Sequence, residues 1–306
     1  MGKARDIRMI GVIFYFLLAA CSGKKTGKSY DNPKSGTIHI SVDESFKPVI
    51  SEQIKVYESS YPEAHIIPEY KSEVECLKDI QKESTRMILI SRGLTRAESQ
   101  FFVNKLNYSP QYDKLAYDAV AVIVNTQAKD SVFSLKKLAS LLSTDQPGKQ
   151  LIVDGNNATS TVKFLQDSVL HGMTFGSGVR AVKGSKAVLD FVAANRDAIG
   201  FVGSSWVGND QDPDQVAYFD KIKFALIECK TCEPGTYAKA SPSTILYKQY
   251  PLVRPLFYVL KENYTGLGSA FAGFMGFERG QLIFRRSYLV PAKMNFQIRS
   301  GKIKTE

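Results

Sequence analysis

Histidine and cysteine are scarce in this sequence of 306 residues, which has three histidines and four cysteines. His39, His65 and His171 lie far apart and lack the short spacings of metal ligands, so we expect no metal site. The sequence also lacks G-x-S-x-G, H-E-x-x-H and any cluster of histidines with carboxylates. We therefore expect no cofactor and no enzymatic activity, and keep a hydrolase only as an alternative.

Long apolar runs are missing as well. The longest near the start covers about a dozen residues, whereas a membrane-spanning helix needs roughly 20. A short basic start, this apolar run and small residues at its end are typical of a secretory signal. The end of the run, Leu18-Ala19-Ala20-Cys21, resembles a bacterial lipobox, which implies cleavage before Cys21 and a diacylglycerol on its thiol. We predict a lipoprotein signal peptide over 1–20; the alternative is an ordinary signal peptide with a chance cysteine.

A nucleic-acid-binding surface is not indicated, although the net charge is +10. Lysines and arginines are dispersed, and no run interleaves them with aromatic residues. Residues 21–36 are polar and rich in Lys, Ser and Gly, so we predict the lipidated cysteine followed by a flexible tether. The folded part follows from residue 37 to 299, with a C-terminal tail over 300–306.

Strands and helices alternate through the folded part. Short β-rich segments at 37–42, 64–70 and 86–91 are separated by segments with helical spacing, which predicts an α/β fold with parallel strands. Two longer β-rich runs, 115–125 and 254–260, are expected to cross between two lobes as a double-crossover hinge, with the ligand cleft between the lobes. We predict a discontinuous lobe 1 over 37–120 and 256–299, and a lobe 2 over 121–255.

Three loops carry polar side chains where strands end and helices begin, which is where anions bind in such folds. Hydroxyl groups, amides and the planar guanidinium of Arg suit an oxyanion. The alternatives are ordinary helix caps and, for Arg92, a surface ion pair. The first loop has Ser45 at an expected N-cap. The candidate ligand residues in the three loops are Ser45, Phe46, Ser91, Arg92, Asn157, Thr159, Ser160 and Thr161.

Several segments resemble the phosphate-binding component of bacterial ABC phosphate transporters, a two-lobe periplasmic substrate-binding protein. The stretch "LAYDAVAVIVN" is similar to that family's first crossover, and "LISRGLT" to its Ser-Ser-Arg-Pro-Leu loop. The stretch "FVAANRDAIGFV" is similar to the family's Gly-Ala-Ile-Gly-Tyr-Val segment. "YPLVRPLFYVLK" and "AFAGFMGFERGQLIFRRSYLVP" resemble its return crossover and C-terminal helices, and the last stretch is the most specific.

This resemblance implies a monomeric, non-catalytic, lipid-anchored receptor on the periplasmic face of a bacterial membrane, inner or outer. It would bind phosphate or a related small oxyanion and deliver it to an ABC permease. The resemblance also implies an acidic acceptor for the phosphate proton; Asp118 is a candidate, and its alternative role is that of a hydrogen-bonded residue in a crossover strand.

Two loops depart from the family pattern. Asp43 and Glu44 stand where many members have a Gly/Ser-rich loop, and Val153 and Asp154 stand where an Arg is expected. Arg92 would then be the main cation. Because of these departures, the alternative stays open that the protein binds another small ligand or a partner protein and that its phosphate site is degenerate.

Cys229 and Cys232 are separated by two residues. In an oxidising compartment they can form a tight disulfide. The alternative, a thioredoxin-like redox motif, requires a helix start at this point. The residues that follow, "EPG", are typical of a turn, which favours the disulfide.

Overall fold

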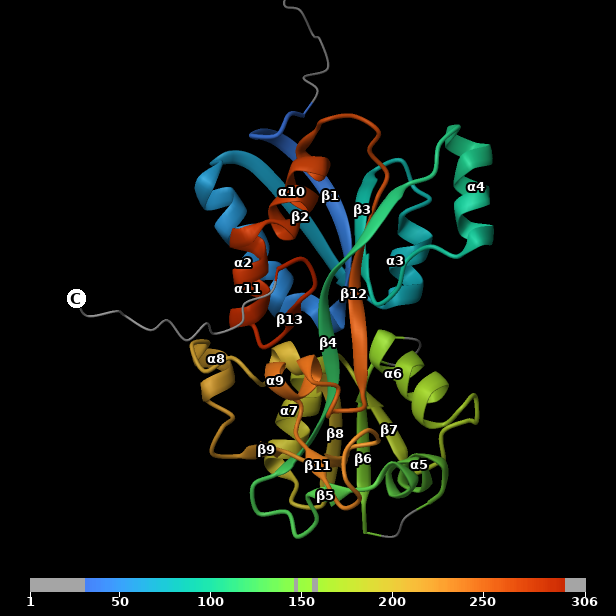
Figure 1. Cartoon of the computed structure of the whole chain (residues 1–306), viewed down its shortest axis with the longest axis vertical. Coiled ribbons are helices and arrows are strands. Elements are labelled where there is room, and N and C mark those ends of the chain that lie inside the picture. Colours follow the sequence, from blue (N-terminus) through green and yellow to red (C-terminus); the bar gives the residue numbers. More distant parts are fainter. Residues whose placement is uncertain (1–30, 146–147, 156–158, 295–306) are drawn as a thin grey trace, which may run out of the picture. The chain divides into compact units, whose positions relative to one another are not determined.

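The computed structural model describes residues 31–145, 148–155 and 159–294. The predicted signal peptide, the lipidation site at Cys21 and the C-terminal tail lie outside the described residues. The fold is built on two sheets that share the long strand β4 (Figure 1), so one strand belongs to two hydrophobic cores. We call the elements around the first sheet lobe 1 and those around the second sheet lobe 2.

The sheet of lobe 1 has the strand order β2-β1-β3-β12-β4. Strands β1, β2 and β3 are parallel, and β12 runs antiparallel to both β3 and β4. The short strand β13 pairs with β4. The bounds are β1 Ser35–Asp43, β2 Glu63–Lys71, β3 Thr85–Ile90, β4 Gln111–Asn125, β12 Val253–Leu260 and β13 Val290–Pro291.

The sheet of lobe 2 continues from the second half of β4 in the order β4-β8-β6-β7. Strands β6, β7 and β8 are parallel, whereas β8 and β9 run antiparallel to β4. A small third sheet has the order β11-β10-β5. The bounds are β5 Val132–Phe133, β6 Gln150–Asp154, β7 Val179–Val182, β8 Ala198–Gly203, β9 Ile222–Phe224, β10 Leu226–Glu228 and β11 Tyr237–Ala238.

Helices connect the strands in both lobes (Figure 1). In lobe 1 they are the 3₁₀ turn η2 Glu44–Phe46, α2 Lys47–Ser60, α3 Glu73–Asp79, α4 Arg96–Leu106, α10 Leu267–Gly276 and α11 Glu278–Arg286. In lobe 2 they are α5 Leu135–Ser143, α6 Ser160–Phe164, the π-helical turn η3 Leu165–Val169, α7 Ser185–Ala194, the 3₁₀ turn η4 Ser204–Trp206, α8 Pro213–Val216 and α9 Pro242–Leu246.

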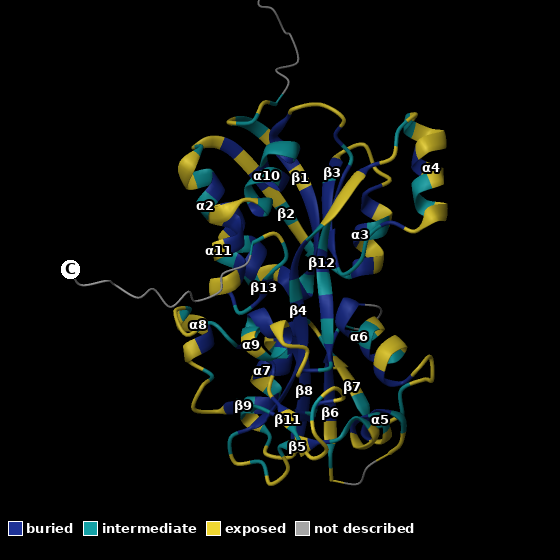
Figure 2. Cartoon of the chain, viewed as in Figure 1, coloured by how far each residue is buried: buried dark blue, intermediate teal, exposed yellow. Residues whose placement is uncertain are grey.

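Strand β3 shows why the sheet of lobe 1 is covered on both faces. Met87 and Leu89 pack with α2, α10 and α11, while Ile88 and Ile90 pack with α3 and α4. Side chains alternate between the two faces of a strand, so a strand with both sets buried must lie between two layers of helices. Figure 2 shows the buried strands between exposed helix surfaces. A separate core fills lobe 2 and includes Val122, Leu138 and Phe201.

The α/β fold with parallel strands is confirmed, and each predicted strand lies within or overlaps an observed one. Strand β4 begins four residues before the predicted 115–125 run, at Gln111. Its pairing changes from β12 to β8 near Val120, as expected of a crossover strand. The lobe boundaries at 120/121 and 255/256 stay predictions.

Candidate functional site

A buried arginine on β12 lies where the two sheets join. Arg254 is opposite Asp118 of β4 in the strand register. Both side chains are buried: that of Arg254 is 1% exposed and that of Asp118 is 0% exposed. The Nε and Nη2 atoms of Arg254 donate to Asp118 Oδ2 at 3.0 and 2.8 Å. Asp118 Oδ1 accepts from the backbone N and the Oγ of Ser204 at 3.0 and 2.7 Å. Asp118 thus has four donors, and its contacts are those of a hydrogen-bonded crossover residue that fixes Arg254.

The free end of the Arg254 guanidinium points to lobe 2. Its Nη1 donates to Ser160 Oγ at 2.9 Å and to Thr161 Oγ1 at 3.1 Å, both in α6. Its carbon Cζ lies 4.9 Å from the centre of the Phe46 ring, a cation–π distance. Arg254 therefore joins the crossover strands, α6 and the first loop of lobe 1 in one group.

The carboxylate of Asp43, at the end of β1, is held by donors from both lobes. Ser45 of lobe 1 donates its backbone N–H at 3.0 Å and also its hydroxyl. Ser160 of lobe 2 donates its backbone N–H at 3.1 Å and its hydroxyl at 2.9 Å. The two hydroxyl oxygens are 3.0 Å apart. Two amides and two hydroxyls converging on one carboxylate form a donor set for an oxyanion.

Glu44, the next residue, makes the same kind of contact with α7. The backbone N–H of Ser185 donates to both Glu44 oxygens at 3.1 and 3.2 Å, and Ser185 Oγ donates at 2.8 Å. A carboxylate at a helix N-terminus is favoured by the helix dipole. Burial raises the pKa of Glu44, and the bonds from Ser185 only partly offset that effect.

Asp154, at the end of β6, lies beside both of these carboxylates. It accepts from Thr159 Oγ1 at 2.9 Å and from Ser185 Oγ at 3.2 Å. Burial, followed by the negative charges of Glu44 and Asp43, raises the pKa of Asp154 to about 7. At neutral pH a large share of this side chain is therefore protonated, which limits the negative charge around Arg254.

The residues of the loop after β3 belong to a different cluster. Glu73, which is buried, accepts from the backbone N and the Oγ of Ser91 at 2.8 and 2.5 Å. Arg92 donates to both oxygens of Glu98 at 2.8 and 2.7 Å and lies 3.9 Å from Glu73. Within the described part of the chain, none of its hydrogen bonds reaches the group around Asp43.

Thr95 and Glu98 form a capping box at the start of α4. Glu98 therefore serves both as helix cap and as the ion-pair partner of Arg92. The alternative role of Arg92, an ion pair near the surface, agrees with its side chain being 31% exposed.

The structure brings together many of the predicted ligand residues but not all. The group around Arg254 and Asp43 contains Ser45, Phe46, Asp118, Ser160 and Thr161, with Thr159 bonded to Asp154 beside it. Ser91 and Arg92 lie in the Glu73 cluster, and Asn157 lies outside the described residues. The expected N-cap at Ser45 is wrong: Asp43 caps η2, and Phe46 holds the N-cap position of α2.

Sequence reasoning missed the residues that complete the group: Arg254, Ser185, Ser204 and Trp206. Arg254 did carry a signal, because a single basic residue stands in a β-rich run that is otherwise apolar. Trp206, the sole tryptophan of the sequence, donates its indole N–H to the carbonyl of Ser45 at 3.1 Å. It thus links η4 of lobe 2 to the first loop of lobe 1.

Glycines permit this close approach. A Cβ on Gly203, the last residue of β8, would lie 2.8 Å from the Ser45 carbonyl oxygen and 3.1 Å from Arg254 Nη2. Gly184 has φ +82° and its added Cβ would lie 3.0 Å from a Glu44 oxygen. Larger residues at these two positions would push the first loop away from lobe 2.

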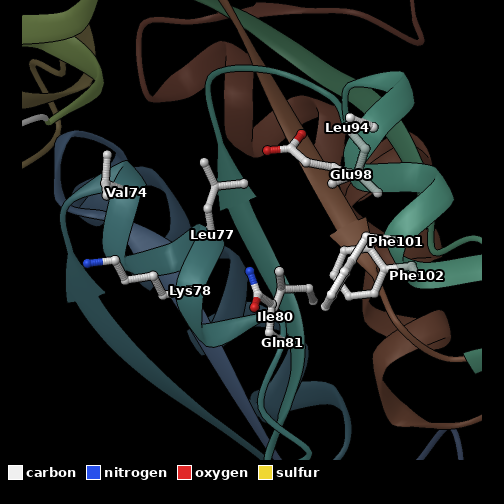
Figure 3. Close-up of a pocket in the computed structure, with 10 residues that line it drawn as sticks. Val74, Leu77, Lys78, Ile80, Gln81, Leu94, Glu98, Phe101 and Phe102 are labelled. Carbon is white, nitrogen blue, oxygen red and sulfur yellow. The ribbon is translucent and has the colours of Figure 1, made fainter. Parts of the chain in front are cut away.

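A separate apolar groove of about 400 Å³ lies between α3 and α4 (Figure 3). Val74 and Phe101 line it, and both are substantially exposed. Glu98, the partner of Arg92, is at its rim, while the Asp43 group contributes no lining residue.

Other features bear on the remaining sequence predictions. The structure links Cys229 and Cys232 in a disulfide with their Cα atoms 5.5 Å apart. Throughout 31–145, 148–155 and 159–294, there is no group of three His, Cys, Asp or Glu residues arranged to hold a metal ion. In those same ranges, no helix combines the length and apolar character needed to cross a membrane.

Solved structures with a similar fold include transport proteins and a regulatory domain. A protein designated as the substrate-binding protein of a phosphate ABC transporter in Clostridium perfringens, solved with bound phosphate, is 21% identical; the match covers 84% of this chain and 100% of that one, with a TM-score of 0.68. An ABC-type phosphate transport receptor from Vibrio cholerae is 17% identical, with coverages of 84% and 100% and a TM-score of 0.60.

The regulatory domain of CcmR from Synechocystis, in complex with 2-PG, is 12% identical, with coverages of 79% and 96% and a TM-score of 0.54. Because the same fold occurs in a transport receptor and in a regulator, the likeness establishes the fold alone. A comparison with curated proteins finds no match. The family model described as "PBP superfamily domain" matches residues 28–277. The chain therefore belongs to the PBP superfamily, the proteins with the periplasmic-binding-protein fold.

Proposed function

We propose that this protein is the extracytoplasmic solute-binding component of an ABC uptake system and that its solute is phosphate or a closely related small oxyanion. One observation carries the proposal: the carboxylate of Asp43 is held by two backbone amides and two hydroxyls that come from both lobes. The same donors, with the guanidinium of Arg254 beside them, suit the oxygens of an inorganic oxyanion. The binding residues would be Ser45, Ser160, Thr161 and Arg254.

Phosphate is the preferred oxyanion for two reasons. The relatives from Clostridium perfringens and Vibrio cholerae are designated as phosphate-transport proteins, and the former holds phosphate. In addition, Asp154 lies beside the donors, and its ionised form can accept a hydrogen bond from the solute. Hydrogen phosphate can donate its proton to such an acceptor, whereas sulfate at neutral pH has no proton to donate. Asp118 is less suited to this role than predicted, because its four donors already occupy it.

The membrane-anchoring part of the proposal rests on the sequence. A signal peptide over 1–20, a diacylglycerol on Cys21 and the tether up to residue 36 would hold the binding domain at the periplasmic face of a bacterial membrane. There, a monomer would capture the ion by closure of two lobes and present it to a permease. Such hinge closure requires no chemical step, so we expect binding without turnover.

Calorimetric titration tests this function. The chain from Ser22 onward, which keeps every described residue, is stripped of bound anions and titrated with phosphate and then with sulfate. We expect saturable one-site binding of phosphate and no heat with sulfate. If neither anion gives heat or raises the melting temperature, the phosphate assignment is wrong, and the search would move to other small molecules or a partner protein.

A further inference from the structure

Two consecutive acidic residues of lobe 1 act as ligands for lobe 2. Asp43 accepts from the backbone N–H and hydroxyl of Ser160, and Glu44 accepts from the backbone N–H and hydroxyl of Ser185. Each of these donors is a group that an anion between the lobes would use. The protein's own carboxylates therefore engage the amides and hydroxyls that an external oxyanion needs.

The Asp43–Ser160 contacts are buried and the Glu44–Ser185 contacts are partly buried, which makes both substantial. Asp43, Ser160 and Ser185 are at most 1% exposed. Charge-assisted hydrogen bonds are stronger than neutral ones, and burial away from water strengthens them further. Because the donors lie in lobe 2 and the carboxylates in lobe 1, breaking these bonds is part of separating the lobes.

Glycines in lobe 2 leave space for the first loop of lobe 1 to lie against that lobe. Gly184 leaves room for Glu44, and Gly203 leaves room for the carbonyl of Ser45, which also accepts from Trp206. The contacts of the Ser45 carbonyl with Gly203 and Trp206 are independent of the carboxylate bonds, and they bring the same two lobes together at the same place. The first loop of lobe 1 is thus fitted against lobe 2 over several residues.

We infer that Asp43 and Glu44 are the affinity-determining residues of the cleft: their carboxylates serve as internal anions that hold the two lobes together without a solute. This inference rests on the proposed function for its ligand, but the internal closure does not depend on it. A phosphate ion that enters must displace the carboxylate of Asp43 from Ser45 and Ser160. The internally closed form cannot bind phosphate, so the larger its population, the lower the apparent affinity for phosphate.

Four proteins test the inference: the wild type, Asp43→Ser, Glu44→Gln and the double variant. Small-angle X-ray scattering of each anion-free protein measures its radius of gyration, and calorimetry measures the phosphate affinity. Asp113→Asn is the matched control, because it removes one negative charge from a surface pair with Lys293 outside this group. Circular dichroism melts show whether each variant is folded, and Glu44→Gln keeps the test usable if Asp43→Ser does not fold.

We expect the wild type and Asp113→Asn to have the same small radius of gyration with and without phosphate. The double variant should be larger without phosphate and become smaller with it, and it should bind phosphate about tenfold or more tightly than the wild type. The single variants should lie between. Equal radii and equal affinities in all five proteins would overturn the inference.

The two proposals fail in different ways. If the folded double variant expands but no protein binds phosphate, the internal closure stands and the phosphate function fails. If every protein binds phosphate equally and the wild type contracts on binding, the phosphate function stands and the internal closure fails.

Discussion

At the scale of single residues, the main feature is one cation among several acids. Arg254 is the buried cation of the group. Asp118 binds it directly, and Asp43 is linked to it through the hydroxyl of Ser160. Asp154 interacts with its charge, and Glu44 shares the Ser185 hydroxyl with Asp154. Burying an ion pair is weak evidence for stability, but removing one partner leaves an uncompensated buried charge. The group therefore has separate consequences for binding and for stability, and each can be measured.

Substitution of Arg254 by Met should weaken phosphate binding about 100-fold or more and lower the free energy of unfolding by roughly 3–5 kcal/mol, because Asp118 loses its partner. Adding Asp118→Leu should restore much of the stability without restoring binding. Calorimetry and urea unfolding measure the two effects. Arg92→Met is the control, and should change the affinity by no more than about threefold because Arg92 bonds to Gly93 and Glu98, outside the proposed site. A large loss in that control and none in Arg254→Met would show that Arg92 is the binding cation.

Asp154 should make stability depend on pH. Burial and neighbouring negative charges raise its pKa from 3.8 to about 7. The folded state therefore holds a proton that the unfolded state releases between these values, so the stability falls as the pH rises from 4 to 7. The melting temperature should drop by several degrees over this range, at roughly 2 °C per kcal/mol for a domain of this size. Asp154→Asn should have a flatter profile, and an unchanged profile would contradict the assignment.

At the scale of helices and strands, the sequence predicted where these elements lie, but it did not predict which distant side chains bind each other. Alternation of β-rich and helical segments predicted the strands, because a strand buried on both faces reads as a short, nearly continuous run of apolar residues. Thr159 as the N-cap of α6 and the capping box of α4 were also readable, because caps are local.

The sequence did not predict the hydrogen-bond and ion-pair partners of Asp43, Arg92 and Arg254. Asp43 and Ser160 are 117 residues apart, and Arg254 and Asp118 are 136 apart. No local pattern determines such a pair. Arg92 was expected to be the main cation because Val153 and Asp154 stand where the family has an Arg, but Glu98, six residues after Arg92, lies close enough to bind it.

The N-terminus of α7 offers a test at this scale. Gly184→Ala places a Cβ at φ +82°, 3.0 Å from a Glu44 oxygen. Gly235→Ala has the same backbone strain at φ +83° but no atom within 4 Å. Backbone strain should lower the free energy of unfolding by about 1 kcal/mol in both variants. In Gly184→Ala the free energy of unfolding should fall further, because Glu44 is displaced. Equal losses in urea unfolding would show that the Glu44 contact contributes nothing.

At the scale of the whole molecule, the proposed function requires a binding domain joined to a lipid anchor. The Cys21→Ser variant tests the anchor, because a serine cannot take the diacylglycerol. Expressed with its signal peptide in a bacterial host, the wild type should sediment with the membranes and incorporate labelled fatty acid. The variant should incorporate none and appear in the soluble extracytoplasmic fraction. Labelling of both proteins would place the lipid elsewhere.

Trp206 provides the most direct test of the central claim that an oxyanion binds between the lobes. It is the sole tryptophan, and its indole N–H donates to Ser45 in the proposed site. The measurement is its fluorescence during titration of the anion-free protein with phosphate, with sulfate in parallel and Arg254→Met as control. We expect a saturable change with phosphate in the wild type, none with sulfate and none in Arg254→Met. A folded wild type whose Trp206 emission does not respond to phosphate, or responds equally to sulfate, would contradict the central claim.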